Sequence, residues 1–320
     1  MTEFELIARY FTRSRGAAVV GNGDDCAVVV PSPGNAFAVT TDTLVEGRHF
    51  LPTIDPCKLG RRAVHVNLSD LAAMGAKPRY ALLSLTLPQI NEAWIAKFSD
   101  GLWAALNQFD VELIGGNTTR GPLAIALTAM GELPPGESLL RSGAKVDDEL
   151  WVSGPLGDAG WALYCLIGDI KAAASASQIA KYECPEARVA LGIALRGIAT
   201  SCIDVSDGLL SEAAHLAEAS GVTISINFAR IPSSLDEPLA STEYSARARH
   251  CLLSTGDAYE LLFTAPVVHH AVVADLLRSN GLSGACIGKV IAQDATAKVR
   301  VLDAQSRPMN IEIKGWDHFS

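Results

Sequence analysis

Carboxylates in positions suited to binding a divalent cation are the most informative residues of this sequence. Six of them stand in glycine turns, at strand ends or inside an apolar helical stretch: Asp24, Asp25, Asp42, Asp70, Asp204 and Asp207. If they converge, each pair about 4 Å apart repels by about 4 kcal/mol at an effective dielectric constant near 20. Lysine is scarce beside them, so convergence would require metal ions. Thr40, Thr41, Ser206 and Asn117 add neutral oxygen ligands, and an oxygen-only set suits Mg²⁺, which commonly binds substrate phosphates.

Each candidate also has a structural interpretation. Asp207 precedes Gly208 and could be a turn residue or a helix cap. Asp204 and Asp70 lie in apolar surroundings, where an unpaired carboxylate is costly, so a metal, a charge partner and a structural role all stay open. Most histidines fall in helical stretches and fit the core or the surface, but His49 follows the acidic strand end at Asp42.

Several common phosphate-binding and catalytic motifs are missing. Gly284 to Val290 has the wrong glycine spacing for a P-loop, and Gly21-Asn22-Gly23 lacks the third glycine and the helix of a dinucleotide-binding turn. The stretch Asp204 to Glu212 is too short for an EF-hand. No zincin, nucleophile-elbow or protein-kinase signature occurs. Phosphate binding through carboxylate-held cations therefore remains as a hypothesis.

Composition limits the class of protein. The chain has 320 residues, 49% of them hydrophobic and 19% charged, which indicates a globular protein with two ordinary domains or one large one. A net charge of −9 argues against a nucleic-acid partner. No apolar run reaches the ~18 residues of a membrane span, and the start lacks a signal-peptide pattern, so a cytoplasmic protein without membrane contact is expected. Seven scattered cysteines predict reduced, mostly buried thiols.

The first block, residues 1–145, alternates strand and helix signals. Expected strands are Ala27–Val30, Ala36–Thr41, Ala81–Leu87, Val111–Ile114 and Leu123–Met130, the last two flanking a loop at Gly115–Thr119. The spacing predicts helices over Leu59–Met74 and after Asn91, which can cap a helix whose apolar face carries Trp94, Phe98 and Leu102.

A linker-like stretch, 133–148, precedes the second block, 146–320, and we place the boundary near 145. Expected strands there are Leu150–Val152, Ser201–Val205, Val222–Phe228 and Tyr259–Thr264, with helices over Leu209–Ala219 and Val267–Ser279. This alternation predicts an α/β or α+β fold in two domains.

The acid-bearing stretches resemble the thiamine-monophosphate kinase family, within the superfamily that includes aminoimidazole ribonucleotide synthetase and selenophosphate synthetase. The similar stretches are Gly21–Ala27, Thr40–Val45, Val66–Gly75, Leu113–Gly121, Ile203–Leu209 and the ending Lys314–Phe319. They follow the family's order and spacing and span nearly the whole chain.

The resemblance implies ATP-dependent phosphorylation of thiamine monophosphate to thiamine diphosphate in a homodimer whose N-terminal domains associate through their sheets. It implies an ATP- and Mg²⁺-binding dimerisation domain at 1–145 and an α/β domain at 146–320 that completes the site. It assigns Mg²⁺ ligands at Asp25, Thr40, Thr41, Asp42, Asp70, Asn117, Asp204 and Asp207, of which Asp42, Asp204 and Asp207 would act in catalysis. ATP contacts would come from Gly116, Asn117, Arg141 and Ser206, and thiamine monophosphate contacts from His49, Asp257 and Trp316.

Two positions depart from the family pattern. Asn117 stands where the family commonly has Asp, so one metal would bind more weakly. Asp257-Ala258 replaces a usual Glu-Asp, which shortens the proposed substrate carboxylate by one methylene. One alternative is another ATP-using enzyme of the superfamily, but Trp316 and the Thr-Arg-Gly after Asn117 favour the thiamine-monophosphate kinase family. A second alternative is a binding protein without catalysis.

Overall fold

The computed structural model describes residues 2–13 and 16–311, and the chain divides into two compact units. Unit 1 consists of Met1–Leu71 and Ala76–Gly136, and unit 2 of Ala72–Gly75 and Glu137–Ser320. The division after Gly136 falls within the linker-like stretch 133–148. Each unit is described by itself below.

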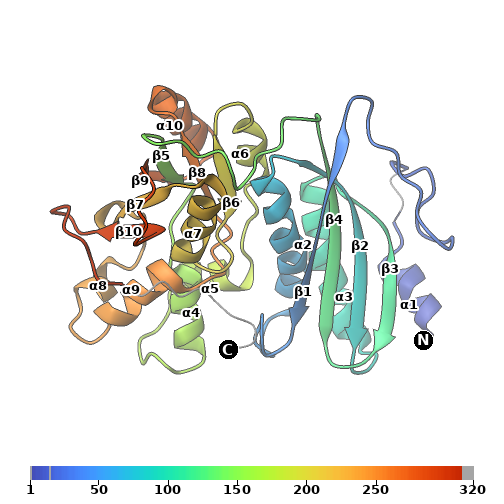
Figure 1. Cartoon of the computed structure of the whole chain (residues 1–320). Coiled ribbons are helices and arrows are strands. Elements are labelled where there is room, and N and C mark those ends of the chain that lie inside the picture. Colours follow the sequence, from blue (N-terminus) through green and yellow to red (C-terminus); the bar gives the residue numbers. More distant parts are fainter. Residues whose placement is uncertain (1, 14–15, 312–320) are drawn as a thin grey trace. The chain divides into compact units, whose positions relative to one another are not determined.

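Unit 1 is a four-stranded sheet with helices on one face (Figure 1). The strand order is β1-β4-β2-β3, with bounds β1 Ala36–Val45, β4 Ala124–Leu133, β2 Lys77–Leu87 and β3 Glu112–Arg120. Only the β2 and β3 pair is parallel among these strands. The covering helices are α2 (Pro56–Ala73) and α3 (Glu92–Gln108), and α1 (Glu3–Tyr10) lies against α3, where the Trp103 indole donates to the Tyr10 carbonyl at 2.8 Å.

The two main helices form where their apolar periodicity predicts. Asn91 caps α3 by accepting the Trp94 N–H at 3.2 Å, and Ile95, Phe98 and Leu102 bury the same face of the helix. In α2 the apolar face includes Val64, Leu68 and Leu71, all buried. Both predicted helices are therefore confirmed.

Three strand predictions in unit 1 were wrong in detail. The strand that starts at Ala36 continues to Val45, so Asp42 lies inside β1 instead of closing it. The expected loop Gly115–Thr119 is part of β3 and pairs with β2. Its glycines serve close approach: Gly116 has φ +154, and a Cβ there would lie 1.9 Å from the Leu83 carbonyl oxygen. Of the run 27–30, only Val28 pairs, in an isolated bridge to Val20.

Unit 2 is built on a six-stranded sheet with the order β10-β7-β9-β5-β8-β6. The strands are β5 Glu149–Val152, β6 Ser201–Asp204, β7 Thr223–Asn227, β8 Leu261–Ala265, β9 Ala285–Ile291 and β10 Val299–Leu302. The helices are α4 Asp158–Leu166, α5 Ala176–Glu183, α6 Val189–Ala194, α7 Leu209–Ser220, α8 Asp236–Ala240, α9 Ser245–Ser254 and α10 His270–Ser279, with 3₁₀ turns η1 Phe228–Arg230 and η2 Val267–His269.

The predicted helix from Leu209 is α7, which ends at Gly221 in the left-handed conformation, with φ 66. The predicted helix Val267–Ser279 is η2 followed by α10. Sequence periodicity did not reveal α4, α5, α6, α8 or α9. The mixed architecture with two sheets confirms the predicted fold class.

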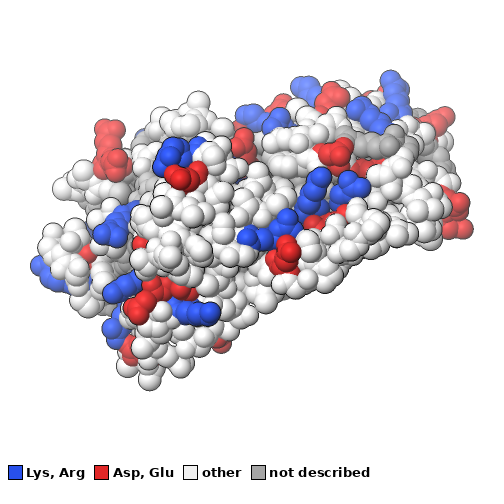
Figure 2. All heavy atoms as spheres, turned by 90° about the horizontal axis from the view of Figure 1, so that it is seen from above, with Lys and Arg blue, Asp and Glu red and all other residues white. Residues whose placement is uncertain are grey.

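The seven cysteines are all free, but only Cys202 and Cys251 are buried, so the prediction of mostly buried thiols was wrong. Across the described residues, no helix combines the length and apolar character that a membrane crossing requires. On the face shown in Figure 2, basic and acidic side chains are interspersed.

Candidate active site

In unit 1, β1 and α2 bring three of the predicted ligands together. The Thr40 hydroxyl donates to Asp70 Oδ2 at 2.5 Å, and the backbone N–H of Asp42 donates to Asn67 Oδ1 at 3.0 Å. Thr40 and Asp42 are two residues apart on a strand, and Asn67 and Asp70 three apart on a helix, so each pair shares one face of its element. The Asn67 amide also donates to the Ala63 carbonyl, which fixes its orientation. Sequence reasoning missed Asn67, although its spacing from Asp70 was a signal.

Thr41 and Asp25 lie apart from this group. The Thr41 side chain is on the opposite face of β1, where its hydroxyl donates to the Leu127 carbonyl and accepts from Thr128. Asp25 lies on an exposed loop, where its N–H donates to Asp24 Oδ1 at 2.9 Å. Within the described part of unit 1, the structure therefore gathers Thr40, Asp42 and Asp70 but not these two side chains.

Gly116 and Asn117 lie on the opposite edge strand of the same sheet. Asp42 pairs with Leu127 of β4, Leu127 with Leu83 of β2, and Leu83 with Gly116 of β3. Three strand spacings of about 4.8 Å separate Asp42 from Gly116 by roughly 14 Å. One chain thus holds the predicted ligand Asn117 well beyond coordination distance of Asp42.

His49 closes the turn that follows β1. Its Nδ1 accepts the N–H of Val45 at 3.0 Å, so the ring has a fixed position near the end of the acid-bearing strand. Gly47, with φ 77, allows the chain to reverse there.

In unit 2, the Asp204–Asp207 loop runs from the last residue of β6 to the residues before α7 and carries Asp204, Ser206 and Asp207. Asp204 ends β6 and is only 4% exposed. The Asp207 N–H donates to Glu212 Oε1 at 3.3 Å, and Gly208, with φ 113, turns the chain into α7. Two carboxylates and a hydroxyl therefore lie within four residues of the chain, directly before the first turn of a helix.

Glu212 reveals the electrostatics of this loop. Burial, and then the negative charges of Asp204 and Asp207, raise the pKa of Glu212 to about 8, while the charge of Arg141 lowers it. The three carboxylates thus repel one another, and Arg141, a predicted ATP contact, lies close enough to act on them. Sequence reasoning named Glu212 only as the end of a rejected EF-hand stretch and did not place it in the site, although it lies in the first turn of α7, five residues after Asp207.

The segment Gly256–Glu260 lies against the same loop. The Asp257 N–H donates to the Ser206 carbonyl and the Tyr259 N–H to the Val205 carbonyl, both at 2.9 Å. Asp257 and Tyr259 have positive φ, of 64 and 49. A Cβ at Gly256 would lie 1.9 Å from the Ser206 carbonyl oxygen, so the two segments approach as closely as glycine permits. The structure thus brings Asp257 beside Ser206. Trp316 lies outside the described residues.

The donor chemistry of both groups fits Mg²⁺. Asp42 and Asp70 in unit 1, and Asp204 and Asp207 in unit 2, supply carboxylate oxygens, and the Thr40 hydroxyl adjoins Asp70. A bound cation would relieve the repulsion that raises the pKa of Glu212. Among the described residues, no three His, Cys, Asp or Glu side chains form a group arranged to hold a metal ion.

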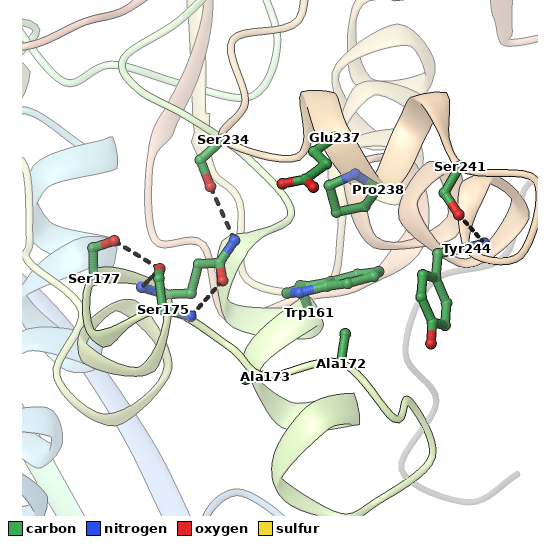
Figure 3. Close-up of a pocket in the computed structure, with 11 residues that line it drawn as sticks. Trp161, Ala172, Ala173, Ser175, Ser177, Ser234, Glu237, Pro238, Ser241 and Tyr244 are labelled. Carbon is green, nitrogen blue, oxygen red and sulfur yellow. Dashed lines mark hydrogen bonds between the residues drawn. The ribbon is translucent and has the colours of Figure 1, made fainter.

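A pocket of about 500 Å³ opens elsewhere in unit 2 (Figure 3). Trp161 and Tyr244 line it together with several serines. Its polar groups satisfy one another: the Gln178 amide donates to Ser234 at 3.1 Å and accepts the Ser175 N–H at 2.9 Å. None of the predicted site residues lines this pocket.

Comparison with known proteins defines the class to which the fold and these acids belong. Residues 23–133 match the family model for AIR synthase related protein, N-terminal domain. The Thiamine-monophosphate kinase of Escherichia coli (strain K12) is 42% identical over 99% of this chain and 98% of its own length. The chain belongs to the thiamine-monophosphate kinase family.

Solved structures agree with this family. The crystal structure of Thiamine-monophosphate kinase from Stenotrophomonas maltophilia K279a has a TM-score of 0.84 and 39% identity, over 94% of this chain and 96% of that one. A structure described as AaThiL complexed with AMPPCP and TMP has a TM-score of 0.75 and 30% identity, over 91% of this chain and 89% of that one.

Proposed function

We propose that this chain transfers the γ-phosphoryl group of ATP to thiamine monophosphate and forms thiamine diphosphate. The observation that supports this most directly is the similarity, over 91% of the chain, to a structure described as a complex with AMPPCP and TMP. AMPPCP is an ATP analogue whose γ-phosphoryl group is not readily transferred, so that complex pairs a donor mimic with the acceptor.

Transfer is direct and needs no strong general base. A terminal oxygen of thiamine monophosphate, already ionised at neutral pH, attacks the γ-phosphorus of ATP. The bond from that phosphorus to the β–γ bridging oxygen breaks, and ADP leaves with the electron pair. The protein mainly positions two anions and neutralises their charge. A phosphorylated protein intermediate in rapid-quench experiments would contradict this route.

Mg²⁺ is held by carboxylate oxygens. Its ligands are drawn from Asp25, Thr40, Thr41, Asp42, Asp70, Asn117, Asp204 and Asp207. When bound, it supplies charge neutralisation to the phosphates of both substrates. Gly116, Asn117, Arg141 and Ser206 bind ATP, and His49, Asp257 and Trp316 bind thiamine monophosphate. Asp42, Asp204 and Asp207 are the carboxylates on which catalysis depends most.

The active form is a homodimer associated through the unit 1 sheets. Helices cover one face of this sheet, and the other face is open, with Val39 of β1 61% exposed. A second copy would bury that face. Within one chain, roughly 14 Å separates Asp42 from Gly116, so Asn117 cannot bind the same ion as Asp42. In a dimer, Asn117 of one chain can instead join the site that contains Asp42 of the other chain.

Mixing two inactive variants tests the shared site. If each site takes Asp42 from one chain and Asn117 from the partner, a heterodimer of Asp42→Asn and Asn117→Ala chains has one site with both residues intact. Re-equilibrated equal mixtures should then regain about a quarter of wild-type activity. No recovery, although mass measurements show that heterodimers form, would mean that each chain uses its own Asn117.

The seven free cysteines fit a reducing compartment, so we place the activity in the cytoplasm, where ATP is available.

A phosphorus NMR time course with ATP, Mg²⁺ and thiamine monophosphate tests the proposed activity, with a control that omits the acceptor. ADP and thiamine diphosphate should appear together and only with acceptor. ADP and free phosphate without thiamine diphosphate would instead indicate a different acceptor. Glu218→Gln, an exposed position on α7, should match the wild type, whereas Asp204→Asn should be inactive.

A further inference from the structure

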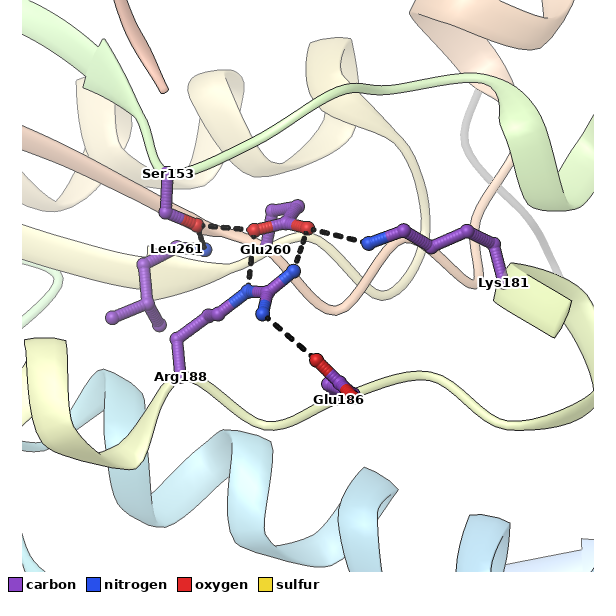
Figure 4. A network of polar contacts seen from close by, with 6 residues as sticks. All are labelled: Ser153, Lys181, Glu186, Arg188, Glu260 and Leu261. Carbon is purple, nitrogen blue, oxygen red and sulfur yellow. Dashed lines mark hydrogen bonds and ion pairs between the residues drawn. The ribbon is translucent and has the colours of Figure 1, made fainter. Parts of the chain in front are cut away.

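A buried ion network is centred on Glu260 (Figure 4). Glu260, with no exposed surface, accepts from Arg188 Nε at 2.7 Å and from Arg188 Nη2 at 2.5 Å. The same carboxylate accepts from Lys181 at 3.3 Å and from the Ser153 hydroxyl at 2.6 Å. Arg188 also pairs with Glu186 at 3.4 Å. Burial alone would raise the pKa of Glu260, but the hydrogen bonds and charges of Arg188, with those of Lys181 and Ser153, lower it.

The network joins elements that are distant in the sequence. Lys181 belongs to α5 and Arg188 directly precedes α6, whereas Glu260 directly precedes β8. Ser153 follows β5, and its hydroxyl also accepts the Leu261 N–H at 2.8 Å. A planar guanidinium bound through two nitrogens fixes orientation as well as distance. The network therefore holds the start of β8 in one position.

That position determines where the site loop lies. The Glu260 carbonyl accepts the Val205 N–H at 2.8 Å, one residue after Asp204. The Tyr259 and Asp257 N–H groups then donate to Val205 and Ser206. Asp257 and Tyr259 are held at positive φ, a conformation that costs roughly 1 kcal/mol or more for such residues and persists only where the surroundings impose it.

We propose that Glu260 and Arg188 are positioning residues for the kinase reaction: their ion pair sets the Asp204–Asp207 loop and Asp257 in mutual register. This inference rests on the proposed function. Neither side chain is a ligand in it, since the Glu260 carboxylate accepts from Arg188, Lys181 and Ser153, and the Arg188 guanidinium donates to Glu260 and Glu186. Because the loop carries proposed Mg²⁺ and ATP contacts and Asp257 a proposed substrate contact, the pair couples the two substrates' subsites.

The first test is Arg188→Lys, which retains the charge and loses the two-nitrogen contact. Arg247→Lys is the matched control, because Arg247 pairs with Asp169 at 2.6 Å through side chains that are 40% and 43% exposed. We expect kcat to fall on the order of 10- to 100-fold in Arg188→Lys, as a displacement of about 1 Å causes, with KM for thiamine monophosphate raised and the thermal midpoint close to that of the control. Arg188→Met should lower kcat further than Arg188→Lys does, so that lysine at this position partly rescues the activity.

Wild-type kinetic constants in a folded Arg188→Lys protein would overturn the proposal, and so would a loss of activity matched by an equal loss of folded protein. If Arg188→Met does not fold, Lys181→Met, which removes a partly exposed member of the network, should still raise KM severalfold.

Hydrogen exchange separates this inference from the proposed function, because it requires no turnover. The amides of Val205, Asp257 and Tyr259 should exchange faster in Arg188→Lys than in Arg247→Lys, while amides of the unit 1 sheet stay unchanged. A wild type without thiamine diphosphate formation would refute the proposed function. Unchanged exchange at these three amides would refute the positioning role, whatever the activity.

Discussion

Substituting Glu212 with glutamine should remove a pH-dependent weakness of the metal-free protein. Burial and the charges of Asp204 and Asp207 raise the pKa of Glu212 to about 8, against 4.5 for an ordinary glutamate. Between pH 4.5 and about pH 8, Glu212 is protonated in the folded chain but ionised in the unfolded chain. Stability is therefore fully present below pH 4.5 and is lost as the pH rises through about 8.

The size of the effect follows from the width of that window. Between pH 6 and pH 8 the free energy of unfolding falls by about 1.4 kcal/mol per pH unit, and it levels off above pH 8. The total loss between pH 6 and pH 9 is therefore about 3 kcal/mol. Glu212 is 3% exposed, so solvent screening reduces this little. The amide introduced by Glu212→Gln cannot ionise, and the variant should keep its stability over the same range.

Denaturant unfolding in EDTA at pH 6 and pH 9 measures this difference. Glu218→Gln is the matched control, because Glu218 is an exposed residue of the same helix in an ion pair with Lys298 at 2.8 Å. That control should follow the wild type. If the wild type loses no more stability than Glu212→Gln does between the two pH values, the carboxylates do not act on Glu212 as described. Added Mg²⁺ should reduce the wild-type loss, because a bound cation offsets the repulsion.

Three further outcomes are expected. Thr40→Val removes the hydroxyl that donates to Asp70 and should raise the Mg²⁺ concentration for half-maximal rate severalfold, at a stability cost of about 1 kcal/mol. An unchanged Mg²⁺ titration would exclude the Thr40 hydroxyl from metal binding. Asn117→Asp adds a carboxylate and should shift the same titration to lower Mg²⁺, and no shift would place Asn117 away from any ion. The lowered pKa of Glu260 contributes stability above pH 4.5, and this stability is lost as the pH falls through the folded-state pKa. Acid unfolding, followed by circular dichroism, should therefore begin at a higher pH in the wild type than in an Arg188→Met, Glu260→Met double variant. Coincident unfolding curves would contradict this.

The sequence was sufficient for elements with a local cause. The helix at α3 follows from one capping residue, Asn91, and an apolar face, both read within a few residues. The continuation of β3 beyond Ile114 was missed because Gly115-Gly116-Asn117 has the composition of a loop. Its pairing depends on the approach of Leu83 on a different strand, which local composition does not encode.

In the candidate active site, too, the sequence indicated some residues and did not indicate others. Asp70 and Asp204 stood out because a carboxylate in apolar sequence needs a reason, and Asp42 because it follows a predicted strand. The structure gives Asp70 a hydroxyl partner from β1. Asn67 and Glu212 were missed although they neighbour predicted ligands, because their significance lies in what they accept: the N–H groups of Asp42 and Asp207. Thr41 has the ligand type of Thr40, but strand alternation places its side chain on the other face.

The Arg188 and Glu260 pair lies beyond sequence reasoning altogether, since 72 residues separate its members. Its burial argues for a positioning role over one in stability alone. Replacing a buried ion pair by packed apolar side chains is often neutral or stabilising, so stability alone gives little reason for a glutamate with no exposed surface. An apolar pair would pack as well but would not fix the direction of the β8 start, on which the hydrogen bonds to Val205 and Ser206 depend. The double variant distinguishes the two roles: if Arg188→Met with Glu260→Met retains the thermal midpoint but loses kcat, the charges serve the geometry of the loop, whereas loss of both together would make them structural.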